Sequence, residues 1–433
     1  MAAVSRRTFL GGAGSLALAA AEHGKAAEPS DRITVGMIAV GSRAQELLEA
    51  IKRNEGTEIV AVADAYSGRL GRAVERTGGR AKPLKDYREI LADPSVDVVT
   101  VASPDHWHKR HVIEALEAGK DVYCEKPLTY TIDEGLEIAA AVKRTGRIVQ
   151  VGSQGISSAA EQEARKMVAS GKLGEVTMVR ASYSRNSASG AWLYPFPPDA
   201  SEETVDWQAF LGDAKQRPFS LERFFRWRCF QEYSGGIATD LFVHLATTIH
   251  YVMGANAPSE VVALGDLYRW KASRDVPDTL NALLRYPEGF TVNLSSTFNN
   301  RSAGTQFQFM GTEGTLTLGY RGWKFEPEII RENNDWIVSA WPAKLEEQYR
   351  DELAAQPPAP KPARAEQGMP GRGGPDSTTL HFGNFMEAVR TRKQPIEDVW
   401  AGHRAAACAH LINASARTGR MTKWDAQRDR QLL

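Results

Sequence analysis

The sequence predicts an α/β protein in which a doubly wound parallel sheet is followed by an α+β part with an open, mainly antiparallel sheet. Short, β-branched apolar runs alternate with segments of helical periodicity over residues 33–153. After Gly152 the expected strands become longer and alternate between polar and apolar residues. A length of 433 residues suits two separate cores. We therefore expect one domain over residues 33–153 and a second over residues 154–433.

Residues 1–32 predict a targeting segment that is not part of the fold. Residues 5–10 contain the paired arginines of a twin-arginine signal, and an apolar run over residues 11–21 precedes a polar stretch. This run is shorter than the roughly 20 residues that span a bilayer, and no cysteine follows it to carry a lipid. We expect export to the periplasm or the exterior without a membrane anchor. The alternative is a frayed basic N-terminus.

The first domain is expected to alternate strands and helices in a regular order. Each predicted strand is a short buried run, and each predicted helix spaces its apolar residues by three and four. Gly119 and Gly146 follow two of these helices and are typical of helix ends. In chain order, we expect strands at 33–40, 58–63, 96–101, 121–124 and 147–151, and helices at 44–53, 67–76, 87–92, 108–118 and 132–144.

The second domain is expected to consist largely of hairpins. Short turns at 287–289 and 312–314 join neighbouring runs that alternate in polarity. The stretch 354–377 is rich in Pro, Gly and Ala and predicts an exposed loop, because it offers little apolar surface to bury. We expect a helix at 159–170, strands at 176–183, 261–270, 280–286, 290–298, 306–310 and 314–318, and two closing helices at 382–391 and 399–418.

The charge balance argues against polyanionic partners. Charged residues make up 24% of the chain and the formal net charge is zero, so there is no electrostatic footprint for a nucleic acid or an anionic membrane. A small neutral partner fits this composition better. The three cysteines form no CxxC pair and are interpreted as buried thiols, with one disulfide as the alternative: Cys124, Cys229 and Cys408.

The first strand-to-helix turn carries a weakened dinucleotide fingerprint. Aligned on G-x-G-x-x-G, the turn keeps the middle glycine, Gly41, and has alanine at the outer positions 39 and 44. Asp64 ends the second predicted strand, where a carboxylate accepts hydrogen bonds from an adenosine ribose. Asp64 repels a 2′-phosphate and so favours NAD, while nearby Arg69 keeps NADP as an alternative. A solvated turn aspartate is the simpler interpretation of Asp64.

Two segments follow strands at the edge of the sheet that faces ligands in doubly wound folds. The first holds Ser103, Pro104 and three histidines, at 106, 108 and 111, but no carboxylate or thiolate pattern completes a metal site there. We therefore expect no metal, and interpret His108 as a helix cap or a neighbour of a nicotinamide. The second segment is Glu125, Lys126 and Pro127. Proline restricts the backbone of Lys126, whose ammonium is able to donate to a sugar hydroxyl or an alkoxide.

A glycine pair introduces a third candidate segment, residues 235–244. Asp240 and His244 are four residues apart and are expected to share a helix face. A histidine polarised by a carboxylate is a competent base for a hydroxyl proton. The glycines at 235 and 236 are interpreted as sites of close approach for substrate or cofactor. Alone, such a pair is more often a helix ion pair.

Taken together, these motifs resemble the glucose–fructose oxidoreductase, inositol dehydrogenase and rhizopine catabolism (Gfo/Idh/MocA) family of sugar dehydrogenases, over residue 33 to the last helix. The resemblance rests on Ser-Pro followed by His108, on Glu-Lys-Pro at 125–127, and on Gly-Gly with Asp240 and His244. It implies that Lys126 and His244 are the catalytic pair and that Asp240 places the substrate. It also implies dimer or tetramer contacts through the open sheet. Alanine at 39 and 44 departs from the family pattern.

From the motifs and the resemblance we predict two sets of binding residues. The substrate set adds a cationic and aromatic segment suited to gripping a saccharide, although packing is an equally good interpretation of that segment. It comprises Lys126, Arg226, Trp227, Asp240 and His244. The cofactor set comprises Gly41, Ser42, Arg43, Asp64, Ser103, Pro104, His108, Glu125, Lys126 and Gln154.

The expected activity is hydride transfer between a ring hydroxyl of a sugar or glycoside and a nicotinamide cofactor. Export complicates this, because soluble NAD is scarce outside the cytoplasm. We therefore expect a tightly held NAD. The first alternative is a redox-neutral glycosidase that forms a transient 3-keto glycoside. The second is a dinucleotide-binding protein without turnover.

Overall fold

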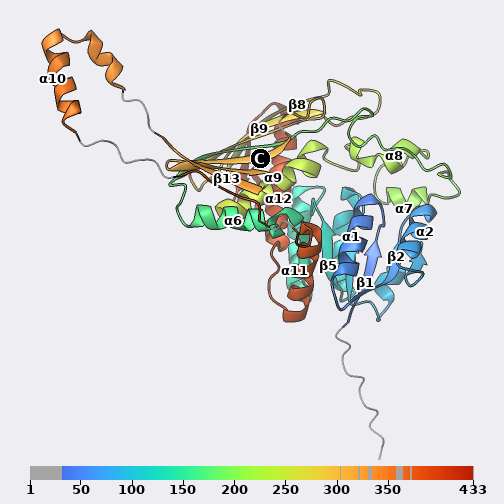
Figure 1. Cartoon of the computed structure of the whole chain (residues 1–433). Helices are drawn as coiled ribbons and strands as arrows, with labels where there is room; N and C mark the ends of the chain where they lie inside the picture. The colour runs from blue at the N-terminus through green and yellow to red at the C-terminus, as the bar shows by residue number, and fades with distance from the viewer. Residues whose placement is uncertain are drawn as a thin grey trace, which may run out of the picture.

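The computed structural model describes residues 32–302, 304–319, 322–329, 334–356, 364–370 and 373–432. The expected targeting segment, residues 1–32, lies outside these residues except for Arg32. Figure 1 shows two layered regions that meet side by side, with the blue N-terminal strands in one and the yellow and orange strands in the other.

A six-stranded parallel sheet forms the first region. The strands follow the order β3-β2-β1-β4-β5-β6, so the order reverses between β1 and β4. Ligands bind at such a reversal in doubly wound folds, beyond the carboxyl ends of the strands. The strands are β1 Ile33–Ile38, β2 Thr57–Ala63, β3 Lys82–Leu84, β4 Val98–Val101, β5 Asp121–Glu125 and β6 Val149–Gly152.

The helices of this region begin and end close to the predicted residues. They are α1 Ser42–Arg53, α2 Ser67–Arg76, α3 Arg88–Ala92, α4 His108–Glu117 and α5 Ile132–Thr145. Gly146 ends α5 in the left-handed conformation that glycine favours. The edge strand β3 was not predicted, because Lys82 and Pro83 are exposed and break the apolar pattern.

A ten-stranded sheet forms the second region, in the order β14-β13-β12-β11-β7-β10-β9-β8-β15-β16. The pair of β7 and β10 is parallel and the other registered pairs are antiparallel. The fold class is therefore as predicted. The strands are β7 Val176–Tyr183, β8 Glu260–Asp266, β9 Thr279–Arg285, β10 Thr291–Thr297, β11 Thr305–Gly311, β12 Gly314–Gly319, β13 Gly322–Pro327, β14 Glu366–Gly368, β15 Thr422–Asp425 and β16 Arg430–Leu432.

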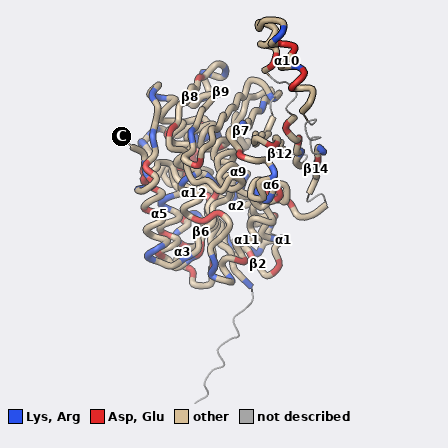
Figure 2. The backbone as a smooth tube through the Cα atoms, turned by 90° about the vertical axis from the view of Figure 1, so that its left-hand side faces the viewer, with Lys and Arg blue, Asp and Glu red and all other residues tan. Residues whose placement is uncertain are grey.

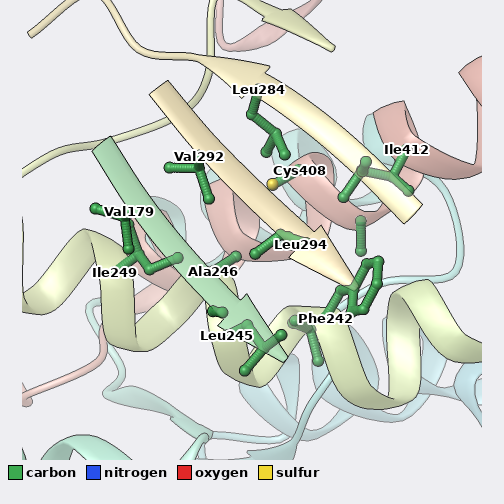
Figure 3. Packing of buried hydrophobic residues seen from close by; sticks show 14 of the residues in the cluster. Val179, Phe242, Leu245, Ala246, Ile249, Leu284, Val292, Leu294, Cys408 and Ile412 are labelled. Carbon is green, nitrogen blue, oxygen red and sulfur yellow. The ribbon is translucent and has the colours of Figure 1, made fainter. Parts of the chain in front are cut away.

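Helices cover one face of this sheet and leave the other open. Figure 3 shows Val179, Val292 and Leu294 on the strands meeting Ala246 and Ile249 of the helix beneath them. Phe242 in the same cluster is fully buried, so truncating it to alanine would cost about 3–5 kcal/mol of stability. On the opposite face Leu264 and Leu283 are 72% and 60% exposed. The covering helices are α6 Ala159–Ala169, α9 Val243–Met253 and α12 Val399–Thr418.

The chain returns to the first region after the second sheet. Helix α11, Ser377–Thr391, packs on α1, and Phe382 and Phe385 are buried in the same cluster as Val35 and Leu47 of the first sheet and helix. The two regions are thus joined by the C-terminal helices as well as by the chain between β6 and β7.

Residues 184–234 form a cover over the ligand-facing edge of the first sheet. They contain two short helices, α7 Trp207–Leu211 and α8 Leu221–Phe225, which had no periodic signal in the sequence. Aromatic side chains hold the cover together. They form one buried cluster of Tyr66, Val205, Trp207, Phe210, Leu211, Phe224, Phe225 and Tyr233.

An arm projects from the edge of the second sheet. It includes helix α10, Ala343–Ala354, which has no buried residue and stands clear of the body in Figures 1 and 2. The chain then forms β14 within the stretch that was predicted as an exposed loop, residues 354–377. Trp323 of β13 pairs with Gly368 there, so backbone pairing orders a segment that has little apolar surface.

The three cysteines are free and buried, as interpreted from the sequence. In the described part of the chain, no group of three or more metal-binding side chains comes together. Over the same residues, no helix is both long and apolar enough to span a bilayer.

Candidate active site

A cavity of about 550 Å³ opens at the carboxyl edge of the parallel sheet. Its floor is made by the turns after β1, β2 and β4, and its wall by the cover over residues 184–234. Of the predicted cofactor residues it is lined by Gly41, Ser42, Arg43, Asp64, Ser103 and Pro104. Trp227 from the predicted substrate set also lines it.

The N-terminus of α1 opens toward this cavity. Gly41 is the N-cap in an extended conformation, no side chain caps the helix, and its first turn has no acidic residue. A Cβ on Gly41 would lie in ordinary contact with the Arg69 guanidinium, at 3.6 Å. Free backbone N–H groups at a helix start attract phosphate oxygens. This end of α1 therefore fits a pyrophosphate.

Ala39 takes the position of the first fingerprint glycine and adopts its backbone conformation. Its φ is +64°, in the left-handed region. That conformation costs an alanine about 1–2 kcal/mol. The turn therefore keeps the fingerprint geometry in spite of the departure in sequence.

Asp64 is buried beside this turn with both oxygens held by backbone groups. Oδ2 accepts from the Val40 N–H at 2.8 Å and Oδ1 from the Tyr66 N–H at 2.9 Å. Arg69 lies 3.6 Å from Oδ1. A carboxylate has about four lone-pair sites, so Asp64 retains acceptor capacity for a ribose hydroxyl. Its place in the cavity favours a ligand over the alternative of a solvated turn.

Arg43 links α1 to the segment after β5. Its Nε donates to Glu125 Oε1 at 2.8 Å, while Nη2 is buried without a hydrogen-bond partner among the described residues. Burial opposes the charged form of Arg43, but the Glu125 carboxylate outweighs burial and raises the pKa of the guanidinium. Glu125 therefore supports Arg43 and does not itself line the cavity. The unpartnered donor, the α1 N-terminus and Asp64 together fit a dinucleotide.

Lys126 and Asp240 form the centre of the site. Lys126 Nζ donates to Asp240 Oδ1 at 2.9 Å and to the Asp240 carbonyl oxygen at 2.8 Å. Arg228 Nε donates to the same Oδ1 at 3.0 Å. Burial would raise the pKa of Asp240, but Lys126 and then Arg228 hold it well below its ordinary value. Asp240 is therefore an ionised carboxylate that fixes the direction of the ammonium.

Asp240 and His244 were expected to share a helix face, and among the described residues no hydrogen bond joins them, although the Asp240 carboxylate acts to raise the pKa of His244. Residues Ala238–Phe242 form a π-helical turn, and the partners of the Asp240 carboxylate are Lys126 and Arg228. The wider turn changes the offset that an α-helix gives residues four apart. The glycine pair also serves packing. Gly236 has a φ of +64°, and a Cβ there would clash with Val276. A Cβ on Gly235 would clash with Thr239.

His244 lies at the start of α9 in a partly buried position. Its ring is 6.3 Å from the ring of Tyr183, between centroids. Burial and then Lys126 lower the pKa of His244 well below its ordinary value. The imidazole is therefore neutral at pH 7 and has a ring nitrogen that is able to accept a proton.

His108 has a positioning role and does not line the cavity. It is buried, with Nδ1 2.6 Å from the Pro127 carbonyl oxygen and Nε2 2.9 Å from the Ser103 carbonyl oxygen. The ring thus fastens the turn after β4 to the turn that carries Lys126. The helix-cap role does not describe these contacts, because no side chain caps α4. That His108 neighbours the nicotinamide stays a prediction.

Lys126, Asp240 and His244 are not among the residues that line the cavity, and neither are two further predicted residues. Gln154 begins the turn after β6, and its Oε1 is buried without a hydrogen-bond partner in the described structure. Arg226 donates to the Tyr194 carbonyl oxygen at 2.8 Å and lies 4.1 Å from the Phe196 ring centroid. Arg226 therefore holds the cover in place, in keeping with the packing interpretation.

Sequence reasoning missed how Arg228 joins the centre of the site. Its neighbour Trp227 carried the aromatic signal, but nothing in spacing indicates that Arg228 reaches Asp240 or stacks 4.2 Å from the Trp227 ring. Lys126 and Asp240 are likewise 114 residues apart. Such pairs arise only when the two regions fold against each other.

Comparisons with known proteins agree with this architecture. A protein identified as 1,5-anhydro-D-fructose reductase from Ensifer adhaerens is 26% identical over 281 residues, which are 65% of this chain and 74% of the relative. Levoglucosan dehydrogenase from Pseudarthrobacter phenanthrenivorans is 25% identical over 58% of this chain and 62% of its own length.

Solved structures share the fold at lower identity. Levoglucosan dehydrogenase in complex with NADH and levoglucosan superposes with a TM-score of 0.69 at 19% identity, covering 90% of this chain and 99% of that one. Aldose-aldose oxidoreductase from Caulobacter crescentus gives 0.66 at 20% identity, with 90% and 99% covered.

Family models match in both regions. Residues 33–153 match the model of the oxidoreductase family with an NAD-binding Rossmann fold, and residues 208–317 match the GFO/IDH/MocA C-terminal domain. The two segments together make up just over half of the chain. The chain therefore belongs to the GFO/IDH/MocA family of oxidoreductases, and its first domain is the family's NAD-binding Rossmann domain.

Proposed function

We propose that this protein transfers hydride between a ring hydroxyl of a sugar or glycoside and NAD. The observation that carries the proposal is the Lys126 ammonium, fixed on Asp240 at 2.9 Å and close enough to the neutral imidazole of His244 to lower its pKa. When bound, the nicotinamide supplies the hydride acceptor or donor. The protein's task is to bind the sugar, hold its hydroxyl and move the hydroxyl proton.

His244 and Lys126 divide the work at the reacting oxygen. The neutral ring nitrogen of His244 accepts the hydroxyl proton during oxidation and returns it during reduction. The Lys126 ammonium donates to the same oxygen as negative charge develops on it. Because Asp240 anchors this ammonium, little reorganisation is needed when the charge appears.

Asp240 also has capacity to bind substrate. Its Oδ1 accepts from Lys126 and Arg228, whereas Oδ2 has no hydrogen-bond partner among the described residues. A second sugar hydroxyl is a suitable donor to Oδ2. Trp227, on the cavity wall, offers an aromatic face against which the apolar side of a pyranose ring packs.

The relatives support a sugar as the substrate class. These relatives are named for 1,5-anhydro-D-fructose and levoglucosan, and a levoglucosan dehydrogenase is solved with NADH and levoglucosan. In this chain, both the cavity and the paired Lys126 and Asp240 suit a polyhydroxylated ligand. Asp64 favours NAD, and Arg69 beside it leaves NADP as the weaker alternative.

The decisive experiment uses the protein as purified, without added nucleotide. It is denatured, and any released dinucleotide is identified by mass spectrometry. The native protein is then mixed with a panel of sugars and glycosides, and absorbance at 340 nm and product masses are recorded. Stoichiometric retained NAD with cleavage of a glycoside and no net NADH supports the redox-neutral alternative. Net reduction of NAD with an oxidised sugar supports the dehydrogenase, and binding of NAD without either product contradicts both.

We also propose that the protein is exported through the twin-arginine pathway. Support comes from the paired arginines and the apolar run within residues 1–32. Fractionation of cells that produce the full chain tests this, with a variant in which Arg6 and Arg7 are both replaced by lysine as the control. Retention of the unchanged chain in the cytoplasm contradicts the proposal.

The open sheet suggests a second copy of the chain as its partner. Its exposed face carries Leu264, Leu283 and Val262, next to the oppositely charged pair of Glu260 and Arg285. A face that bears both charges beside an apolar patch is able to pair with itself across a two-fold axis. Light scattering on Leu264→Asp, which should dissociate the assembly, tests this against Thr317→Asp at the other end of the face. A monomeric unchanged protein contradicts it.

A further inference from the structure

Arg185 lies two residues after the end of β7 and has no ion-pair partner among the described residues. Its guanidinium lies 5.1 Å from the centroid of the Tyr183 ring, and its backbone N–H donates to the Thr297 carbonyl oxygen at 3.1 Å. Among the described residues, no carboxylate forms an ion pair with it. A half-buried arginine that keeps its charge free of carboxylates is poised to bind an anion.

Tyr183 places this cation close to His244, the proposed base. The Tyr183 ring that stacks with Arg185 also lies 6.3 Å from the ring of His244. The electrostatic effects agree: burial and Lys126 lower the pKa of His244, and Arg185 adds to them. Arg185 acts in the same direction as Lys126 and Arg228 on the pKa of Asp240.

The charged side chains around Asp240 include more cations than carboxylates. Lys126, Arg228 and Arg185 all lie close enough to Asp240 to lower its pKa, and Asp240 is the ionised carboxylate between the first two. Burial raises the pKa of the nearby Asp105, whose carboxyl accepts from Thr239 and forms no ion pair with a described cation. Two of the three cations are satisfied by Asp240, which leaves Arg185 to a ligand.

The positive surface continues outward from Arg185. The next three residues, Asn186, Ser187 and Ala188, line an open hollow of about 500 Å³ with Arg269 and Arg301. Arg269 stacks 4.4 Å from the ring of Trp270, and neither arginine forms an ion pair with a described carboxylate. A ligand that is bound by Arg185 and extends into this hollow therefore meets two further guanidinium groups.

We propose that the substrate is an acidic sugar whose carboxylate is bound by Arg185, and that the outer hollow takes a further acidic sugar unit. The proposal rests on the sugar oxidoreductase function argued above and specifies its substrate class. A planar guanidinium matches a carboxylate with two parallel hydrogen bonds, and the Tyr183 ring restricts its orientation. The expected substrate is thus a uronic acid or a short uronide, in contrast to the small neutral partner that composition alone suggested.

The test compares matched pairs of sugars that differ only in the C6 group. D-Glucuronate and D-glucose, D-galacturonate and D-galactose, and D-mannuronate and D-mannose are titrated into the protein as purified, and binding is measured by calorimetry. We expect at least one acid to bind tenfold or more tightly than its neutral counterpart, and the digalacturonate or another diuronide to bind more tightly still. The preference should decrease as salt concentration rises.

Variants assign the preference to Arg185. Arg185→Met should reduce it to less than twofold, and Arg185→Lys should restore part of it. Arg180→Met removes the same charge from the exposed face of β7, five residues before Arg185, and should leave the preference unchanged. If no acid binds more tightly than its neutral counterpart, or if Arg185→Met keeps the full preference, the proposal is wrong. Oxidation of neutral sugars with NAD in that case would leave the proposed function intact.

Discussion

Lys126 and Asp240 come from different regions of the fold and meet through two hydrogen bonds, one to the carboxylate at 2.9 Å and one to the carbonyl oxygen at 2.8 Å. The side chains of both residues are mostly buried, at 10% and 13% exposure. The lysine sits on the turn after β5 and the aspartate on the π-helical turn before α9. Their contact therefore depends on the correct docking of the second region against the Rossmann domain.

Replacing Lys126 by methionine should remove the donor to the developing alkoxide. We expect kcat/KM to fall by about 10²–10⁴-fold, the usual effect of losing one such group. Binding of NAD, measured by calorimetry, should change far less. Lys109→Met is the matched control, because Lys109 forms an exposed ion pair with Glu137 away from the cavity. Equal losses of activity in the two variants would contradict the role of Lys126.

The pH profile of the reaction should lack the inflection of an ordinary histidine. Because burial and Lys126 lower the pKa of His244, the neutral base persists well below pH 6.5. We expect kcat/KM for oxidation to vary by less than about threefold between pH 6 and 8. Initial rates with the substrate identified above measure this, and His244→Asn should remove most of the activity at every pH. An inflection near 6.5 in the unchanged protein would contradict the lowered pKa of His244.

The turn after β1 provides a contrast between two alanines. Ala39→Gly removes the strain of an alanine in the left-handed conformation, while the glycine makes the unfolded chain more flexible. We therefore expect the free energy of unfolding to stay unchanged or to rise by up to about 1 kcal/mol. Ala44→Gly puts glycine inside α1 at a buried position, where it should cost about 1 kcal/mol. Urea midpoints at pH 7 measure both. A larger loss in Ala39→Gly than in Ala44→Gly would contradict the backbone assignment.

These alanines also show how far the sequence determines the fold. Buried β-branched runs such as those of β1 and β4 are short, regular and bounded by turn residues, so the parallel sheet and its helices were predicted within a few residues. The cover over residues 184–234 was not, because Phe210, Phe224 and Phe225 make their contacts without any helical or strand period. The edge strand β14 was not predicted for a similar reason, because backbone pairing with β13 stabilises it and its sequence has no strand pattern.

The site was predictable where function depends on a residue type at a strand end. Gly41, Asp64 and Lys126 follow strands of the parallel sheet, so their common edge could be inferred. Arg185 and Arg228 act through contacts between distant segments, which spacing does not encode. The spacing of Asp240 and His244 also did not reveal the π-helical turn between them, in which Lys126 and Arg228 are the hydrogen-bond partners of the Asp240 carboxylate.

Stability should decline at both ends of the pH range. Burial lowers the pKa of His250 to about 3 and of His106, His381 and His410 to about 4. In the unfolded chain these histidines take up protons near pH 6.5, so the stability of the native protein falls as pH decreases below that value. Urea midpoints should therefore be lower at pH 5 than at pH 7. A midpoint that stays constant over this interval would contradict the neutral, buried state of these rings.

The loss of stability at high pH should depend on Glu397. Burial raises the pKa of Glu397 to about 8. Its protonated form contributes stability fully below the unfolded pKa of about 4.5, and this contribution is lost as pH rises through about 8. Glu397→Gln should thus change stability little at pH 5 and raise it by about 1–3 kcal/mol relative to the unchanged protein at pH 9. Glu387→Gln, exposed on α11, is the control and should show no such pH dependence.

Asp64→Asn should change the choice of cofactor. The amide keeps one oxygen acceptor for the backbone N–H groups of Val40 and Tyr66 but replaces the other with a donor, and it removes the negative charge beside Arg69. We expect NAD to bind about tenfold more weakly, through loss of charge-assisted hydrogen bonds to the ribose. NADP should gain relative to NAD, because Arg69 then meets a 2′-phosphate without a competing carboxylate. Calorimetric titration of protein freed of nucleotide gives both affinities, with Asp93→Asn on a distant exposed turn as the control. If the ratio of the NAD affinity to the NADP affinity is unchanged, Asp64 only accepts hydrogen bonds from the turn and does not bind the ribose.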